Sequence, residues 1–338
     1  MFDDSTTLGY EAEWSTNFDM MLHALHAAGH VPDPNVHRYH CDCQHCTDLQ
    51  NRYHQFPFRA QHDSSVSGEI ISGIHNLTVP DGWARLNDTF QILEQTAFAT
   101  DCEPSPSAGF HVHARTHNLA THRVRDYLDG RYALAVAGVV LSLPAITTIW
   151  GFGRHQTYGH NNTDTYAEVN NILRASFSRS SMAQAMHDMV DEFDQIDEIN
   201  NTGQVPEGGV NEGRRNFAQQ FLRYITGLDR HSYVGMRTRY NTLEFRFWRS
   251  TRVAWRMQLA CLMSGLLVSP TYARDVLTIH GPRASGPSLA NPDWLLDLIR
   301  RYATDNPDDI RYPLLVELME EQLDYVNTTN SVPAGYTA

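Results

Sequence analysis

The stretch Gly-Phe-His-Val-His at residues 109–113 places two histidines two positions apart, with apolar residues beside them. In a β-strand, side chains two positions apart point to the same face of the sheet. A strand here therefore presents His111 and His113 on one face, while Phe110 and Val112 point to the other. The pattern predicts a strand that separates a hydrophobic core from a polar surface able to bind cations or phosphate.

Two distant segments repeat this alternation with charged side chains. The first, Gly-Tyr-Glu-Ala-Glu-Trp, pairs Glu11 with Glu13, and the second, Leu-Glu-Phe-Arg, pairs Glu244 with Arg246. Each pair lies on one face of its strand, and the apolar residues between them face a core. Three such strands predict a sheet that holds cations and a polyanion.

The other secondary-structure signals place strands and helices in an irregular order. Period-two patterns and turn residues predict strands at 8–14, 56–62, 69–74 and 109–116, and a hairpin at 234–249. Helical periodicity predicts helices at 16–29, 83–100, 163–199, 254–268, 293–303 and 313–326. Hairpins without regular βαβ units predict an α+β fold with an antiparallel sheet.

Residues 132–153 contain no charged side chain. By length alone such a stretch could cross a bilayer. Pro144 and several hydroxyl residues dilute its apolar character, and the rest of the chain has the composition of a soluble protein. A buried core helix is the favoured interpretation.

The charged residues of this chain exclude several functions. The net charge of -13 argues against a general nucleic-acid-binding surface, which would carry a basic excess. All 26 basic residues are arginine. Without lysine, the chain has no P-loop lysine, no kinase strand lysine and no amine for a Schiff base. ATP chemistry in this protein must therefore use arginine and metal ions, which can neutralise phosphates.

Three of the five cysteines fall within six residues, among several histidines. This spacing favours a metal site over disulfides, and structural zinc takes four such ligands. We expect a structural zinc site in an insertion at residues 31–50, and the alternative is a reduced loop without metal. The expected ligands are Cys41, Cys43, Cys46 and His40, with His37 and His45 as alternative histidines.

The first residues are acidic and lack an apolar stretch, so we do not expect a signal peptide. Together with cysteine spacing that suits a metal, this predicts a reducing, cytoplasmic location. We expect neither a nucleic acid nor a membrane as a partner.

Each polar pair also has a structural interpretation. Close carboxylates repel unless a cation such as Mg²⁺ neutralises them, but Glu11 and Glu13 would also suit a solvent-exposed edge strand. The two histidines of residues 109–113 would also suit hydrogen-bonded core or surface positions. Glu244 and Arg246 would also suit a structural ion pair with neighbouring strands.

Taken together, these segments resemble the glutamine synthetase / glutamate-cysteine ligase superfamily of carboxylate-amine ligases. They are most similar to its amidoligase family, a branch often found in bacteria and their phages. Glu11 and Glu13 match the opening Glu-x-Glu strand, which binds metal. Residues 63–73 resemble the amidoligase segment that carries a further metal-binding glutamate, here Glu69. Taken alone, Glu69 would more simply lie at a strand end in water.

Two later motifs extend the resemblance. His111 and His113 match a Gly-x-His-x-His strand whose first histidine binds metal and whose second lies near an ATP phosphate. Glu244 and Arg246 match a Glu-x-Arg strand in which the glutamate holds metal and the arginine stabilises the transferred phosphoryl group. The resemblance implies a curved antiparallel sheet with a glutamine synthetase-like catalytic fold over residues 8–270. The helical extension at 271–338 has no counterpart in it.

The resemblance implies that ATP phosphorylates a substrate carboxylate and that an amine then attacks the acyl phosphate. Two or three Mg²⁺ ions would be held by Glu11, Glu13, Glu69, His111 and Glu244. Arg246 is the first choice and Arg239 the second for the γ-phosphate, with His113 and Arg237 also near the nucleotide. The substrates would be an amine and a carboxylate of a peptide, a protein or a cell-wall fragment.

Two other functions remain open at the level of sequence. The chain would be a catalytically inactive relative, serving as a structural or binding protein, if the strands persist without ATP turnover. A zinc-dependent hydrolase using His111 and His113 is the weaker alternative, because no third ligand or general base lies nearby in the sequence.

Overall fold

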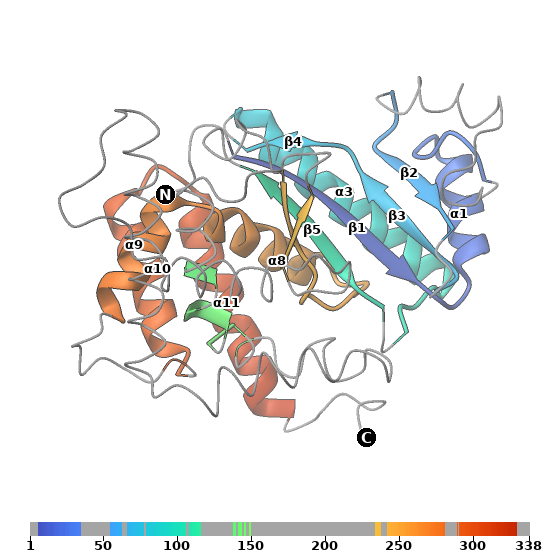
Figure 1. Ribbon diagram of the computed structural model, residues 1–338. Helices are drawn as coiled ribbons and strands as arrows, with labels where there is room; N and C mark the ends of the chain where they lie inside the picture. The colour runs from blue at the N-terminus through green and yellow to red at the C-terminus, as the bar shows by residue number, and fades with distance from the viewer. Residues whose placement is uncertain are drawn as a thin grey trace, which may run out of the picture.

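The computed structural model shows a mixed α+β fold in which helices lie against one antiparallel sheet (Figure 1). The structure describes residues 6–34, 55–62, 66–77, 79–105, 108–115, 234–237, 242–280 and 291–329, together with residue 289 and single positions between 138 and 149. Within these residues, the expected α+β class with antiparallel strands is confirmed.

Seven strands form one sheet in the described part of the chain. They are β1 (Thr7–Trp14), β2 (Phe58–Gln61), β3 (Gly68–Ser72), β4 (His75–Asn76), β5 (Phe110–Arg115), β6 (Val234–Arg237) and β7 (Thr242–Phe245). Six lie side by side in the order β2-β3-β1-β5-β7-β6, while β4 pairs with the start of β1. All pairs are antiparallel. β1 therefore lies in the interior of the sheet, with strands on both sides.

The described helices are α1 (Phe18–Ala27), α3 (Pro80–Thr100), α8 (Ala254–Leu267), α9 (Pro270–Ile279), α10 (Asp293–Asp305) and α11 (Arg311–Thr329). Of these, α3 and α8 lie against one face of the sheet (Figure 1). α3 and α8 contact each other, α8 contacts β1 and β5, and α1 packs on α3 (Figure 1). α11 packs on α8 and on α10. As a result, α8 lies between the sheet and the outer helices.

The sheet face that meets α3 and α8 is apolar, because alternate residues of β1 and β5 point to it. Tyr10 of β1 lies beside Phe110 of β5 and Phe90 of α3, with ring centroids 5.0 and 5.3 Å away. The Tyr10 hydroxyl donates a hydrogen bond to Thr89 Oγ1 at 2.8 Å. The polar atom of this phenol is thus satisfied inside the core, which fixes β1 on α3.

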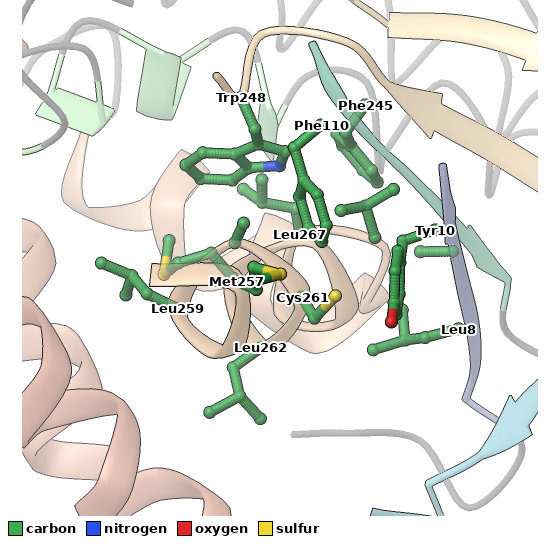
Figure 2. Packing of buried hydrophobic residues seen from close by; sticks show 14 of the residues in the cluster. Leu8, Tyr10, Phe110, Phe245, Trp248, Met257, Leu259, Cys261, Leu262 and Leu267 are labelled. Atoms are coloured by element: carbon green, nitrogen blue, oxygen red, sulfur yellow. The ribbon is translucent and has the colours of Figure 1, made fainter. Parts of the chain in front are cut away.

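α8 is apolar on nearly every side, because it is enclosed by the sheet and by α11. Figure 2 shows Phe110 and Trp248 facing the part of α8 that carries Met257 and Cys261. The Trp248 indole Nε1 donates a hydrogen bond to Ser264 Oγ of α8 at 2.8 Å. This contact ties the chain after β7 to the central helix.

The expected strands and helices that fall within the described residues are present, with end points shifted by a few residues. Two short elements, β4 and α9, were missed. α9 follows Ser269, whose side chain accepts a hydrogen bond from the Tyr272 N–H at 3.4 Å, and it begins with Pro270. Both are start signals for a helix. The strand expected to reach Ile74 ends at Ser72, and Ile74 is 84% exposed.

The uncharged stretch 132–153 is described only at single positions, and these are helical and buried, as expected of a core helix. Among the described residues, no helix combines the length and apolar character needed to cross a membrane. The helix expected at 163–199 lies outside the described residues. The boundary between a catalytic domain at 8–270 and a C-terminal extension stays a prediction.

Gly82 provides a test of how α3 meets the sheet. A Cβ atom at Gly82 would lie 1.7 Å from the backbone oxygen of Asn76 in β4. Gly→Ala in a helix normally stabilises a protein, but here we expect Gly82→Ala to lower the free energy of unfolding by about 1–3 kcal/mol, because backbone must move. Urea denaturation measures the change. Gly73→Ala, where a Cβ meets nothing within 4 Å, is the control, and an equal loss in both variants would contradict the packing.

His75 on β4 makes stability depend on pH. Burial, together with nearby Arg85, lowers the pKa of His75 from 6.5 to about 4. The unfolded chain therefore binds a proton below pH 6.5 that the folded chain binds only near pH 4. The free energy of unfolding should fall by up to about 3 kcal/mol from this group as the pH decreases through that window. Thermal unfolding of His75→Gln should show a shallower fall, whereas His23→Gln, an exposed histidine of α1, should match the parent protein.

Candidate metal centre

The sheet face opposite α3 and α8 carries the polar pairs of β1, β5 and β7. The register sets their neighbours: Glu11 is the Cα partner of His111, and His113 is the partner of Glu244. Residues directly opposite each other in antiparallel strands have side chains on the same face. Three segments far apart in the sequence therefore bring carboxylates and imidazoles to one place.

Glu11, His111 and Glu244 form the centre of this group. The His111 Nδ1 atom lies 3.5 Å from Glu11 Oε2 and 3.7 Å from Glu244 Oε1. One potential ligand atom of each residue lies within 4.8 Å of the other two. The side chains of His111 and Glu244 are buried, whereas 22% of the Glu11 side chain is exposed. Two carboxylates and an imidazole fit a divalent cation, because Mg²⁺ and Mn²⁺ prefer oxygen and Mn²⁺ also accepts imidazole.

Glu13 lies on the other side of the His111 ring. Its Oε1 atom is 3.4 Å from His111 Nε2, and its Oε2 atom accepts a hydrogen bond from the Gly109 N–H at 2.6 Å. The Cα partner of Glu13 on β3 is Glu69, whose carboxylate accepts a hydrogen bond from the Gln61 amide of β2. A second pair of carboxylates thus adjoins the first group.

His113 and Arg246 border the centre on the β7 side. His113 Nε2 lies 3.4 Å from Glu11 Oε1 and 4.0 Å from Glu244 Oε1, and its Nδ1 atom lies 3.3 Å from the Thr242 hydroxyl. The Arg246 guanidinium donates a hydrogen bond to Glu244 Oε1. A guanidinium and an imidazole at the rim give the site groups suited to an anion.

The balance of charge favours binding of a cation. Burial alone would raise the pKa of the Glu11 carboxyl, but His113 and His111 beside it hold that pKa well below its ordinary value. Glu11 is therefore ionised, which is the form that binds a metal. Three further carboxylates are almost fully buried, with relative exposures of 1%, 4% and 0% for Glu13, Glu69 and Glu244. Buried carboxylates are costly unless cations compensate them.

Seven of the candidate site residues lie on this face: Glu11, Glu13, Glu69, His111, His113, Glu244 and Arg246. Arg237 is the last residue of β6, where its Cα partner is Thr242 of β7. Arg239 and the expected zinc ligands lie outside the described residues; these ligands are Cys41, Cys43, Cys46 and His40.

The structure rules out two of the structural interpretations considered from the sequence, and it adds two residues to the site. The solvent-exposed edge strand considered for Glu11 and Glu13 is wrong, because β1 lies between β3 and β5. The strand-end position in water considered for Glu69 is wrong as well, because its side chain is buried. Gln61 and Thr242 were missed, although Thr242 shares the alternation of Glu244 and so points to the same face.

Neither a protein-family model nor a curated protein matches this chain.

The carboxylate of Glu244 should control metal affinity. Glu244→Gln keeps the shape of the side chain but removes its charge, and we expect it to weaken binding of Mn²⁺ by about 10–100-fold or more. Electron paramagnetic resonance of free Mn²⁺ measures the affinity. Glu103→Gln is the control, because Glu103 is an exposed carboxylate paired with Arg252 at 3.0 Å. Equal Mn²⁺ affinity of the Glu244→Gln variant and the parent protein would exclude Glu244 as a ligand.

Proposed function

We propose that this protein is an ATP- and Mg²⁺-dependent carboxylate-amine ligase, with a sheet similar to that of glutamine synthetase. One observation carries the proposal: Glu11, His111 and Glu244 come from three different strands, and their ligand atoms lie within 4.8 Å of one another. Arg246, beside Glu244, supplies a guanidinium next to this group. Carboxylates for cations and an arginine for phosphate are what phosphoryl transfer requires.

In the proposed reaction, ATP phosphorylates a substrate carboxylate, and an amine attacks the acyl phosphate and releases phosphate. Bound Mg²⁺ would neutralise the charge of the phosphate oxygens. Glu11, His111 and Glu244 would hold one ion, and Glu13 and Glu69 another. These residues keep their ligand atoms close because each is fixed by strand pairing.

Arg246 would donate hydrogen bonds to the transferring phosphoryl group, since the planar guanidinium matches its oxygens. His113, oriented by the Thr242 hydroxyl, would contact a nucleotide phosphate. Arg237 and Arg239 would add positive charge on the neighbouring hairpin arm. None of these roles requires a covalent bond between protein and substrate.

The two described cysteines support a mechanism without a thiol nucleophile. Burial raises the pKa of the Cys102 thiol to about 12, and it raises the pKa of Cys261 well above its ordinary value. Thiols of this kind stay protonated and are poor nucleophiles. The chain also contains no lysine. Attack by a substrate amine on an acyl phosphate fits these constraints.

The proposal includes the finer expectations drawn from the sequence. These are a cytoplasmic enzyme, a structural zinc insertion at 31–50, and substrates that supply an amine and a carboxylate from a peptide, a protein or a cell-wall fragment. An inactive relative that serves as a structural or binding protein is the outcome if nucleotide does not bind.

A metal-dependent hydrolase is a second candidate, and one observation favours it. The sequence offered no third ligand beside the histidines, but Glu11 and Glu244 both lie within 3.7 Å of the His111 ring. This arrangement would also hold a metal-bound water. Hydrolysis that needs the metal but no nucleotide would support this candidate over the ligase.

Trapping of the acyl phosphate tests the ligase. With Mg²⁺-ATP and candidate acids, hydroxylamine should yield a hydroxamate together with ADP. Arg246→Ala should lower kcat/KM by about 10²–10³-fold, because it removes charge stabilisation at the phosphoryl group. Arg300→Ala, which removes an exposed ion pair with Glu320, is the control. Lack of ATP binding at millimolar concentration would contradict the proposal and favour a structural or binding protein.

A further inference from the structure

One oxygen atom of Glu244 lies close to three nitrogen-bearing side chains, of which the guanidinium of Arg246 is positively charged. Glu244 Oε1 accepts the hydrogen bond from Arg246, and the same atom lies 3.7 Å from His111 Nδ1 and 4.0 Å from His113 Nε2. Glu244 is also a member of the candidate metal triad with Glu11. The Glu244 oxygen that lies near the His111 ring is therefore the oxygen that Arg246 holds.

Because Arg246 already occupies this oxygen, a divalent cation would have to compete with it for the Glu244 carboxylate. A cation bound by Glu244 and His111 would lie next to a guanidinium on the same carboxylate oxygen. Two positive charges on the same carboxylate oxygen repel each other, and the repulsion is strong where little solvent screens it. Solvent screens little here, because Glu244 is fully buried. The cation and the guanidinium therefore compete for Glu244.

Packed aromatic residues flank Arg246 in the chain, so a response of the guanidinium to a cation would come from rotation of its own side chain. Phe245 and Phe247 on either side of it are buried, and their rings meet edge to face at 5.8 Å. Phe247 in turn lies 4.4 Å from the Trp248 ring, which is anchored to α8. The Arg246 side chain itself is 15% exposed, so part of it reaches solvent.

We propose that Arg246 is an internal counter-cation of Glu244, which a divalent cation displaces, so that the guanidinium is released to an anion only once the metal is bound. The inference rests on the proposed metal centre and concerns the order of binding, which the ligase reaction alone does not set. Metal and anion then favour each other through one side chain, and this coupling is reciprocal.

Removal of Arg246 should have opposite effects on metal affinity in the absence and in the presence of an anion. An arginine that only binds phosphate would not produce this reversal. Removal of Arg246 should tighten binding of a metal alone, because the competitor for Glu244 is gone. The same change should weaken binding of the metal in the presence of an anion, because the released guanidinium no longer contacts it. An arginine that contacts only phosphate would leave the affinity for metal alone unchanged.

Mn²⁺ alone and Mn²⁺ with inorganic pyrophosphate are the probes, titrated into the full chain by calorimetry and electron paramagnetic resonance. We expect Arg246→Gln to bind Mn²⁺ alone about 5–50-fold tighter than the parent protein, and to lose this advantage or reverse it with pyrophosphate. Arg300→Gln, at an exposed ion pair, should match the parent in both conditions.

A double-mutant cycle with Glu244→Gln separates direct competition from general repulsion. In the Glu244→Gln background, the gain from Arg246→Gln should shrink to less than about twofold, because the shared oxygen has lost its charge. A gain that persists there indicates repulsion at a distance and overturns the inference. If that background binds Mn²⁺ too weakly to measure, nuclear magnetic resonance of the parent protein replaces the cycle. The Arg246 Nε–H resonance, assigned as the one that Arg246→Gln removes, should shift when Mg²⁺ alone is added. A resonance that does not move also overturns the inference.

Failure of the ligase and failure of this inference give different results. If pyrophosphate reverses the effect of Arg246→Gln on Mn²⁺ affinity but no hydroxamate forms, the inference is supported and the ligase reaction is contradicted. Hydroxamate formation with unchanged or weaker Mn²⁺ binding in Arg246→Gln would keep the ligase and overturn the inference. Absence of Mn²⁺ binding in the parent protein would overturn both the inference and the metal centre.

Discussion

The pairing of β1 on both sides is the constraint on which the rest of the structure depends. Because β3 and β5 flank this strand, its side chains on the face opposite the helices lie in the middle of that face and not at an edge of the sheet. Its other face is fixed in the core through Tyr10, which touches two aromatic rings and donates to Thr89. A slip of the register by one residue would exchange the two faces. The core therefore holds Glu11 and Glu13 in place.

The sequence was sufficient to predict which residues share a face but not how strands are ordered. Alternation within a strand is local, so the pairs Glu11–Glu13 and His111–His113 could be read directly. Register between strands depends on packing of distant segments, so the sequence could not show that Glu69 faces Glu13. For the same reason Gln61, which donates to Glu69 from an adjacent strand, was missed. Short elements such as β4 offer too few residues for a periodic signal.

The strand pairing becomes irregular just after β7, next to Arg246. Val112 pairs with Phe245, but Gly109 bridges to Arg249, so the β7 side contains one more residue than β5 over this span. Such an extra residue is a β-bulge, which bends the strand and redirects a side chain. Arg246 lies in this span, directly after the last residue of β7, and its guanidinium still reaches Glu244.

Glu13 shows how the two groups of carboxylates depend on each other. Its Oε2 atom is held by the Gly109 N–H, and its Oε1 atom lies 3.4 Å from His111 Nε2. A histidine that binds metal through one ring nitrogen commonly donates its other N–H to a carboxylate, which fixes the tautomer and the ring orientation. With Nδ1 of His111 turned to Glu11 and Glu244, Glu13 is placed for that orienting role. The backbone N–H of residue 109 thereby holds Glu13 next to His111, a member of the candidate metal triad.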